Sequence, residues 1–174
     1  YEAIKGDSLA VVKWKYQRYL KDYLATAKSL DRNIGKILDY LDKAHLSENT
    51  IVIYASDQGF YMGEHGWFDK RFMYEESLRT PFVMRYPGVI KPGSTIPNMV
   101  VNIDFAPSIL GMAGVAIPEA MQGMNLVPLL KKEPLIKPWR SSMYYHYYEF
   151  PEPHRVAPHF GIRTQRYKLI RFYG

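Results

Sequence analysis

The sequence predicts an α/β fold that ends in a small antiparallel sheet. A long amphipathic helix is predicted from Tyr16 to about Lys43, because apolar residues recur three or four positions apart along it. The apolar run Thr50–Ala55 follows without alternation, which is typical of a strand buried on both faces. A helix leading into such a strand is the repeating half-unit of an α/β sheet, and parallel sheets of this kind bind ligands beyond the carboxyl ends of their strands. Ser56–Gly59 occupy that position.

Further strands and a second helix are predicted in the middle of the chain. Phe82–Tyr86 lies between two proline-containing turns and is expected to form a strand, and a third strand is expected at Met99–Ile103. Asp104 is expected to cap the helix that follows, and Gly114 to close it in a left-handed conformation. These segments add another strand-helix step to the α/β lobe.

The last third of the chain has a different character. Residues 116–140 contain four prolines, too many for long regular elements, so this segment is predicted to be a connection across the surface. Ser142–Phe150 is dense in tyrosine and is predicted to be a strand, while Phe160–Arg163 and Tyr167–Phe172 are predicted to form a hairpin. The tail should therefore be a small antiparallel sheet.

Composition excludes several classes of protein. The 174 residues include no cysteine, which excludes disulfides, thiolate metal sites and a cysteine nucleophile within them. No apolar run is long enough to span a bilayer as a helix, so no membrane span is expected. The formal net charge of +6 favours acidic partners such as sulfated or phosphorylated groups, although the basic residues are spread along the chain. Because the sequence begins at Tyr1 without a leader, we interpret it as a piece of a longer protein.

The most informative stretch begins at Ser56 and continues to Pro81. Asp57 and Gln58 come directly after the predicted strand, so a carboxylate and an amide oxygen can face the crevice there. Hard cations such as Ca²⁺ or Mg²⁺ prefer oxygen ligands of this kind. The alternative is that Asp57 only caps a turn, which is common in Asp-x-Gly sequences.

Two more candidates lie downstream. Lys70 follows Asp57 by thirteen positions, across a loop with three glycines, and its ammonium could bind an anionic oxygen or simply lie in solvent. His65 lies in a glycine-flanked turn, where it could polarise a bound group or hold the turn by a hydrogen bond. Glu75 and Arg79 are four residues apart and are predicted to form an ion pair that braces this loop.

Together these residues resemble the metal- and sulfate-binding segment of the sulfatases, in the alkaline-phosphatase superfamily. The similarity includes the Asp-Gln-Gly after the strand, the Gly-Glu-His-Gly turn, the lysine after it and the Tyr-Glu/Arg/Pro block that ends at Pro81. The resemblance implies the C-terminal part of an alkaline-phosphatase-like α/β/α sandwich. It also implies that Asp57 and Gln58 bind a divalent metal, with Ca²⁺ expected and Mg²⁺ the alternative. Lys70 would bind the sulfate and stabilise charge as the ester bond breaks, and His65 would be the second catalytic residue.

The tail resembles the smaller C-terminal subdomain of the same family, through Tyr144–Tyr147 and Gly161–Leu169. In those enzymes this sheet leans over the active-site pocket and helps to choose the substrate. The resemblance therefore implies a catalytic-domain part over residues 1–140 and the start of the subdomain over 141–174. It also implies three candidate substrate contacts, namely His154, His159 and Arg163.

As a whole, the pattern is similar to bacterial sulfatases that act on sulfated amino sugars of glycosaminoglycans or mucins, including the N-acetylglucosamine-6-sulfatase group. Sulfatases use a formylglycine made from the Cys or Ser of a Cys/Ser-x-Pro-x-Arg sequence, and no such sequence occurs here. The nucleophile and the remaining acidic ligands are therefore expected upstream, and this chain is expected to be inactive without that N-terminal remainder. The family also implies a periplasmic or secreted location.

Two alternatives remain open. A phosphodiester or phosphonate hydrolase of the same superfamily would have a related site, and the nucleophile that separates the two lies outside these residues. A basic module that binds acidic glycans or nucleic acid without catalysis would fit the net charge of +6. No nucleic-acid partner is expected, however, because no clustered basic helix or nucleic-acid motif occurs.

Overall fold

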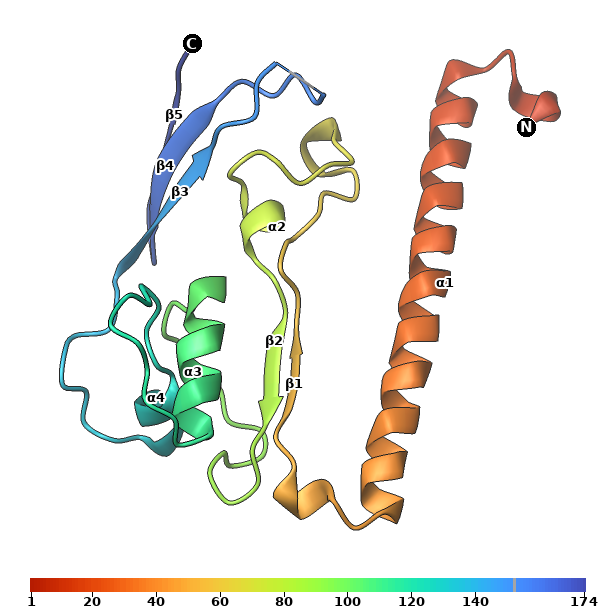
Figure 1. The fold of residues 1–174 in the computed structure, drawn as a ribbon. Helices are drawn as coiled ribbons and strands as arrows, with labels where there is room; N and C mark the ends of the chain where they lie inside the picture. Colours follow the sequence, from red (N-terminus) through yellow and green to blue (C-terminus); the bar gives the residue numbers. More distant parts are fainter. Residues whose placement is uncertain (152) are drawn as a thin grey trace. The chain divides into compact units, whose positions relative to one another are not determined.

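The computed structural model describes residues 1–151 and 153–174, which divide into two units. The first unit comprises Tyr1–Ile51 together with Phe60–Asp69, and the second comprises Val52–Gly59 together with Lys70–Gly174. The long helix α1 (Ser8–Lys43) belongs to the first unit, whereas every strand of the described chain belongs to the second (Figure 1). The Asp57 end of the predicted site therefore lies in the second unit.

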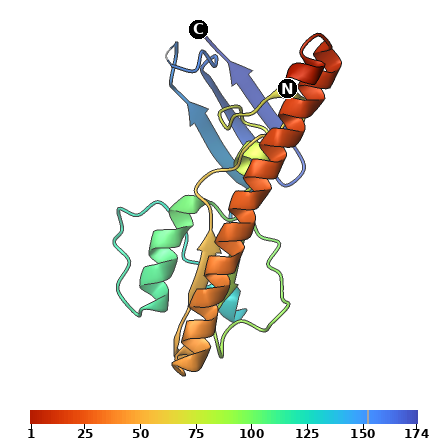
Figure 2. The same ribbon diagram turned by 90° about the vertical axis from the view of Figure 1, so that its right-hand side faces the viewer.

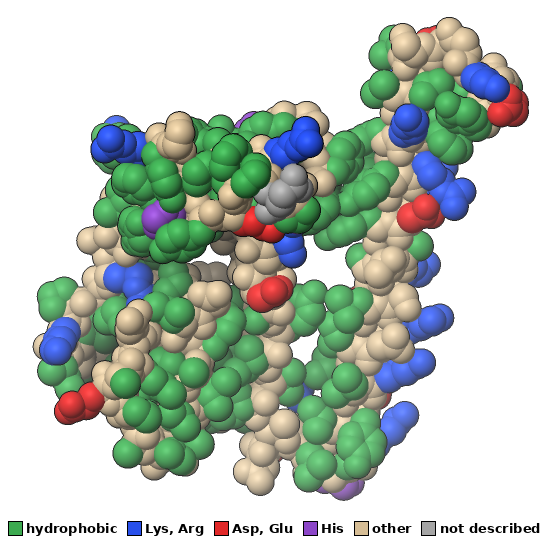
Figure 3. Space-filling view, turned by 45° about the horizontal axis from the view of Figure 1, so that its top comes forward, with side chains coloured by type: hydrophobic (Ala, Val, Ile, Leu, Met, Phe, Trp, Pro, Cys, Tyr) green, Lys and Arg blue, Asp and Glu red, His purple; other side chains and the backbone are tan. Residues whose placement is uncertain are grey.

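Helix α1 is longer than the sequence pattern predicted. It ends at Lys43 as expected, but it begins at Ser8 rather than at Tyr16. The carboxylate of Asp7 accepts a hydrogen bond from the backbone nitrogen of Ala10 at 3.0 Å, so the helix begins at this N-cap. Figure 3 shows Lys and Arg side chains along one side of α1. Two short 3₁₀ helices, η1 (Glu2–Ile4) and η2 (Ser47–Asn49), flank it.

The turn segment of the first unit packs on α1 through aromatic rings. Phe68 contacts Tyr19 with ring centroids 4.8 Å apart, in an edge-on arrangement, and Tyr16 at 6.4 Å. Edge-to-face pairs at these separations stabilise beyond their burial alone. This segment also contains the 3₁₀ helix η3 (Glu64–Gly66).

The first sheet of the second unit contains two antiparallel strands. Strand β1 (Val52–Ala55) pairs with β2 (Phe82–Arg85), and both lie where the sequence predicted strands. The expectation that β1 is a parallel strand buried on both faces is wrong, because β2 is its one partner in the described chain and Tyr54 remains 40 % exposed. One face of the pair is covered, as Phe82 stacks on Phe105 at 4.9 Å, and the other face keeps its apolar side chains exposed.

Phe105 belongs to the predicted second helix, which is confirmed as α3 (Phe105–Met112) and is followed by Gly114 at φ +68°. The strand expected at Met99–Ile103 is wrong, because Asn102–Asp104 form the 3₁₀ helix η4. The backbone nitrogen of Val101 donates to the Asp104 carboxylate at 2.9 Å, so it makes no strand ladder bond.

Asp104 does not cap α3 through its side chain as predicted. Its carboxylate is completely buried and accepts hydrogen bonds from Val101, from the backbone nitrogen of Met124 at 2.7 Å and from the guanidinium of Arg140. These contacts attach the predicted surface connection to the lobe. That connection contains one short helix, α4 (Val127–Lys131), in agreement with its proline content.

The predicted antiparallel sheet at the end of the chain is confirmed. Strands β3 (Ser142–Tyr147), β4 (His159–Thr164) and β5 (Lys168–Phe172) lie side by side in that order (Figures 1 and 2). A β-carbon on Gly161 of β4 would lie 2.5 Å from the sulfur of the fully buried Met73, so this close approach requires glycine. The domain division after residue 140 stays a prediction. Among the described residues, no helix has both the length and the apolar character that a membrane span needs.

Candidate metal and anion site

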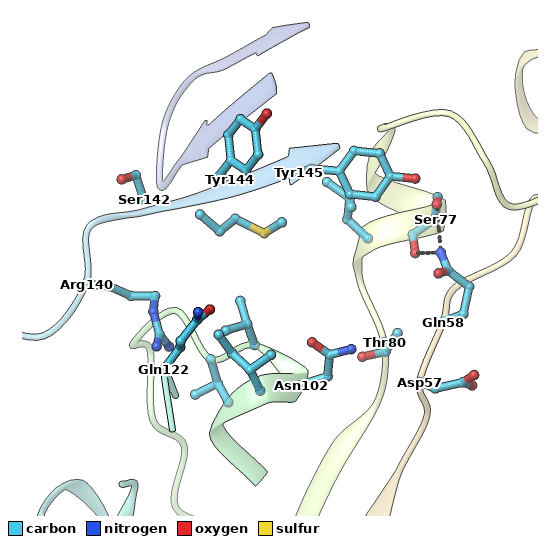
Figure 4. Close-up of a pocket in the computed structure, with 15 residues that line it drawn as sticks. Asp57, Gln58, Ser77, Thr80, Asn102, Gln122, Arg140, Ser142, Tyr144 and Tyr145 are labelled. Atoms are coloured by element: carbon cyan, nitrogen blue, oxygen red, sulfur yellow. Dashed lines mark hydrogen bonds between the residues drawn. The ribbon is translucent and has the colours of Figure 1, made fainter. Parts of the chain in front are cut away.

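Asp57 and Gln58 follow the end of β1 and line one cavity of about 540 Å³ in the second unit (Figure 4). The wall also contains polar side chains from η4, from the connection and from β3. Polar side chains of the lining that are labelled in Figure 4 include Thr80, Asn102, Gln122, Arg140, Ser142 and Tyr144. A cavity with a carboxylate and several amides suits a polar ligand.

The Asp57 carboxylate is exposed, and it makes no hydrogen bond or ion pair with the residues that the structure describes. It therefore does not cap the following turn, which was the alternative to metal binding. The turn is instead held by the hydroxyl of Ser56, which donates to the carbonyl oxygen of Gln58 at 3.0 Å. Such an unpaired carboxylate at the wall of a cavity is available to a cation.

The side chain of Gln58 is held on one side. Its amide nitrogen donates to the carbonyl oxygen of Ser77 at 2.8 Å, to the Ser77 hydroxyl at 2.9 Å and to the carbonyl oxygen of Lys70 at 3.2 Å. Ser77 lies in the short helix α2 (Glu75–Leu78) and is almost completely buried. The amide oxygen of Gln58 accepts none of these hydrogen bonds and can therefore coordinate a metal ion.

Gly59 allows the chain to approach α2 closely. Its backbone nitrogen donates to the Ser77 carbonyl at 2.9 Å, and a β-carbon there would lie 2.0 Å from the Glu76 carbonyl oxygen. No side chain fits at this position, so the end of β1 is fixed against the end of α2.

Lys70 combines a fixed backbone with a free side chain. Its carbonyl oxygen accepts from Gln58 and from the Ser77 hydroxyl, the latter at 2.5 Å. The next carbonyl, that of Arg71, accepts from the Tyr145 hydroxyl at 2.8 Å. The ammonium of Lys70 is exposed and has no hydrogen bond or ion pair within the described ranges 1–151 and 153–174. It is free to bind an anion.

His65 belongs to the first unit, whereas Asp57 and Lys70 belong to the second. It has a left-handed backbone (φ 57°), and its ring contacts those of Tyr61 and Trp67 with centroids 6.0 and 6.2 Å apart. The turn around it is supported by Glu64, which accepts from the backbone nitrogen of Met62 at 2.6 Å, and this hydrogen bond lowers the pKa of Glu64. The catalytic role of His65 stays a prediction.

Glu75 and Arg79 do not form the predicted ion pair. Helix α2 ends at Leu78, and Arg79 has an extended backbone, so no helical turn brings the two side chains together. Glu75 instead pairs with Arg163 at 3.2 Å and with Lys168 at 2.7 Å. Hydrogen bonds from Arg163 and then Lys168 lower the pKa of Glu75. Arg163, a predicted substrate contact, is therefore already paired with a residue of α2.

The two histidines predicted as substrate contacts do not line the cavity of Asp57. His159 is completely buried, and its Nδ1 lies 2.9 Å from the carbonyl oxygen of Ala157, so it has no surface for a ligand in this structure. His154 is exposed and contacts Arg71 and Glu149. Their roles in binding stay predictions. The rings stacked around His159 are Phe72, Tyr145 and Tyr147.

Ser77 and Asn102 were not predicted as site residues from the sequence. Ser77 lies inside the Tyr-Glu/Arg/Pro block, so its place in that motif was the available signal. Asn102 had none, because it was assigned to a strand that does not form.

The described residues contain no group of three or more His, Cys, Asp or Glu side chains that could hold a metal. Asp57 and Gln58 offer a carboxylate and an amide oxygen, and these fit a hard cation in chemistry but not in number. A metal at this position needs further ligands from outside these residues.

Two family matches cover the chain between them. Residues 4–115 match the family described as Sulfatase. Residues 63–174 match the family described as N-sulphoglucosamine sulphohydrolase, C-terminal. The overlap of the two matches contains Lys70 and α2.

Individual proteins agree with these matches. The chain is 54 % identical over 173 residues to an N-acetylglucosamine-6-O-sulfatase of Bacteroides thetaiotaomicron, covering 98 % of the chain and 31 % of that protein. It superposes with a TM-score of 0.92 and 53 % identity on the solved structure of BT4656 in complex with its substrate D-glucosamine-2-N,6-O-disulfate, covering 99 % of this chain and 36 % of that one. A phosphonate monoester hydrolase from Silicibacter pomeroyi matches with a TM-score of 0.71 and 27 % identity, and the match covers 82 % of this chain and 30 % of that one. The chain thus spans about a third of the length of the curated relatives it matches.

Proposed function

The chain belongs to the sulfatase family, and from that premise we propose that it is the C-terminal part of a sulfuric ester hydrolase that acts on sulfated amino sugars. The observation that carries the proposal is that the Asp57 carboxylate lies beside Gln58 at the wall of a cavity and has no partner among the described residues. It occurs in a chain that is 54 % identical to an N-acetylglucosamine-6-O-sulfatase. The substrate class proposed is a glycosaminoglycan or mucin amino sugar that carries a sulfate ester.

Membership of this family suggests a divalent metal cofactor, and we propose Ca²⁺, with Mg²⁺ as the alternative. Asp57 and Gln58 would supply two oxygen ligands, with the others from the N-terminal remainder of the protein. A bound metal of this kind polarises a sulfate oxygen as a Lewis acid. The formylglycine nucleophile is also proposed to lie in that remainder.

Lys70 is proposed to bind the sulfate group. Its ammonium is exposed and unpaired among the described residues, while its backbone is fixed by Gln58 and Ser77. A positive charge close to the sulfate stabilises the negative charge that develops as the ester bond breaks. His65 is retained as a proposed second catalytic residue. The proposed location is the periplasm or the exterior of the cell.

A second candidate function is phosphonate monoester hydrolysis. The match to the Silicibacter pomeroyi enzyme, at 27 % identity over 82 % of this chain, favours it specifically. Asp57, Gln58 and Lys70 would suit a sulfate ester or a phosphonate monoester, because both present anionic oxygens around a tetrahedral sulfur or phosphorus atom.

The test is an assay of the full-length protein that contains these residues. We expect it to release sulfate from N-acetylglucosamine-6-sulfate, and we expect Lys70→Ala to lower kcat/KM by about 100-fold or more. Lys91→Ala is the matched control, since Lys91 is an exposed lysine of the same unit outside the cavity, and it should keep full activity. Hydrolysis of a phosphonate monoester without sulfate release would establish the second candidate instead.

A further inference from the structure

The amide of Gln58 faces three oxygen atoms, and each can only accept a hydrogen bond from it. Two are the backbone carbonyl oxygens of Ser77 and Lys70, which have no proton to donate. The third is the Ser77 hydroxyl, which lies 2.5 Å from the Lys70 carbonyl oxygen and donates its own proton there. The side of the amide that faces these atoms must therefore be the NH₂ group.

From this contact set we infer that Ser77 and the Lys70 carbonyl act as positioning groups, which hold the Gln58 amide in one orientation with its oxygen free for the metal. The inference rests on the proposed function, because Gln58 is a metal ligand only within that proposal. It goes further by assigning the orientation of the ligand to named partners.

A flipped amide would place its oxygen against two carbonyl oxygens. It would lose the hydrogen bonds of 2.8 and 3.2 Å and replace them with repulsion between acceptors. The orientation of an amide is normally assigned from its surroundings, and here two obligatory acceptors leave one choice.

The acceptors are themselves held in place. Ser77 is 1 % exposed, and its carbonyl lies at the end of α2, where helical carbonyls lack a partner within the helix. That carbonyl oxygen accepts hydrogen bonds from the backbone nitrogen of Gly59 and from the side-chain amide of Gln58. Because Gly59 has no room for a side chain, the spacing between the two segments is set by backbone contact.

The same contacts join the two halves of the proposed site. The Lys70 carbonyl oxygen accepts hydrogen bonds from both Gln58 and Ser77. Gln58, the proposed metal ligand, is therefore hydrogen-bonded to the backbone of Lys70, the proposed sulfate binder. A ligand that is already oriented loses less conformational freedom when the metal binds, which strengthens binding.

The decisive variant is Gln58→Glu in the full-length protein. It keeps the shape of the side chain and adds a negative charge, which on charge alone would strengthen Ca²⁺ binding. Our inference predicts the opposite, because a carboxylate oxygen would then face the Ser77 and Lys70 carbonyls. We expect the dissociation constant for Ca²⁺, measured by titration calorimetry of metal-stripped protein, to rise about tenfold or more.

Gln122→Glu is the matched control, since Gln122 lines the same cavity and the change adds the same charge. We expect it to leave Ca²⁺ binding as tight as before or tighter. Ser77→Ala should weaken Ca²⁺ binding by a few-fold, because two carbonyl acceptors remain. Thermal unfolding of each metal-free variant is the measurement that checks whether the fold is retained.

Gln58→Ala separates this inference from the function on which it rests. If Gln58→Ala leaves Ca²⁺ affinity unchanged, Gln58 is not a ligand, and both the proposed metal site and the inference are wrong. If Gln58→Ala weakens binding while Gln58→Glu binds as tightly as the unchanged protein, the inference is overturned and the proposed function stands. Weakening by both variants, with Gln122→Glu unaffected, supports the inference.

Discussion

Asp57 and Asp104 were both predicted to follow a strand, yet they have opposite environments in the structure. Asp104 is completely buried and accepts hydrogen bonds from Val101, Met124 and Arg140. Asp57 is exposed and has no partner among the described residues. The two carboxylates therefore differ in every contact that determines their role.

The difference shows how a structural carboxylate is distinguished from a candidate ligand. Removing a charge from water is costly, so a buried carboxylate is tolerated only when its oxygens are fully paired. Asp104 meets this condition and holds three separate segments together. Among the described residues no partner pairs with the oxygens of Asp57, which lie at the wall of a cavity and are therefore available to a ligand.

The largest expected effect concerns Asp104. Asp104→Asn should lower the free energy of unfolding by about 3 to 5 kcal/mol, because it leaves the mostly buried guanidinium of Arg140 without its counter-ion. Urea denaturation of the full-length protein measures this loss. Replacing Arg140 by Gln in the same protein should recover part of it. A loss below about 1 kcal/mol would show that water can replace the Asp104 carboxylate as the partner of Arg140, and the contrast with Asp57 would disappear.

The next effect concerns Asp57. Asp57→Asn should leave the unfolding free energy of the metal-free protein within about 0.5 kcal/mol, because the side chain has no partner to lose among the residues that the structure describes. It should weaken Ca²⁺ binding by about tenfold or more, measured by calorimetric titration, because a hard cation loses a charged ligand. Unchanged Ca²⁺ affinity would remove Asp57 from the proposed metal site.

The smallest effect concerns Glu75, which is half exposed yet paired and so lies between the two aspartates. Arg163 and then Lys168 lower its pKa below the ordinary value of 4.5, so its contribution to stability is present above that pH and is lost as the pH falls through the lowered pKa. Glu75→Gln should therefore cost about 0.5 kcal/mol near neutral pH, and the difference from the unchanged protein should vanish in acid.

Chemical denaturation at several pH values checks this expectation, with Glu119→Gln as the control. Glu119 is exposed and has no ion pair within the described part of the chain, so its replacement should change stability little at any pH. A Glu75 effect that persists unchanged in acid would contradict the ion-pair explanation.

Much of the secondary structure could be predicted because its signals are local. The repeat of apolar residues located α1 up to Lys43, proline and glycine bounded β2, and the tyrosine-rich tail formed the expected sheet. The start of α1 was missed because Asp7 and its partner Ala10 precede the clear part of the pattern. The expected burial of β1 was wrong because burial depends on neighbouring strands, which the apolar run itself does not specify.

The candidate site shows the same division. Residue type, together with the resemblance to the sulfatases, predicted Asp57, Gln58 and Lys70 as site residues, since carboxylate, amide and ammonium groups carry their chemistry wherever they lie. They could not identify the partner of Glu75, because Arg163 is 88 positions away and nearer Arg79 fitted the helical spacing equally well.

The sequence by itself thus determined most of the elements, the family to which the chain is related and the groups proposed to bind a metal and an anion. Only the tertiary structure decided which of these groups are free and which are occupied. Ser77 lies 19 positions from Gln58, and Arg140 lies 36 positions from Asp104, so both contacts exist only in the folded chain. The physical reason is that local periodicity sets the backbone conformation, whereas burial and hydrogen-bond pairing depend on which distant segments meet.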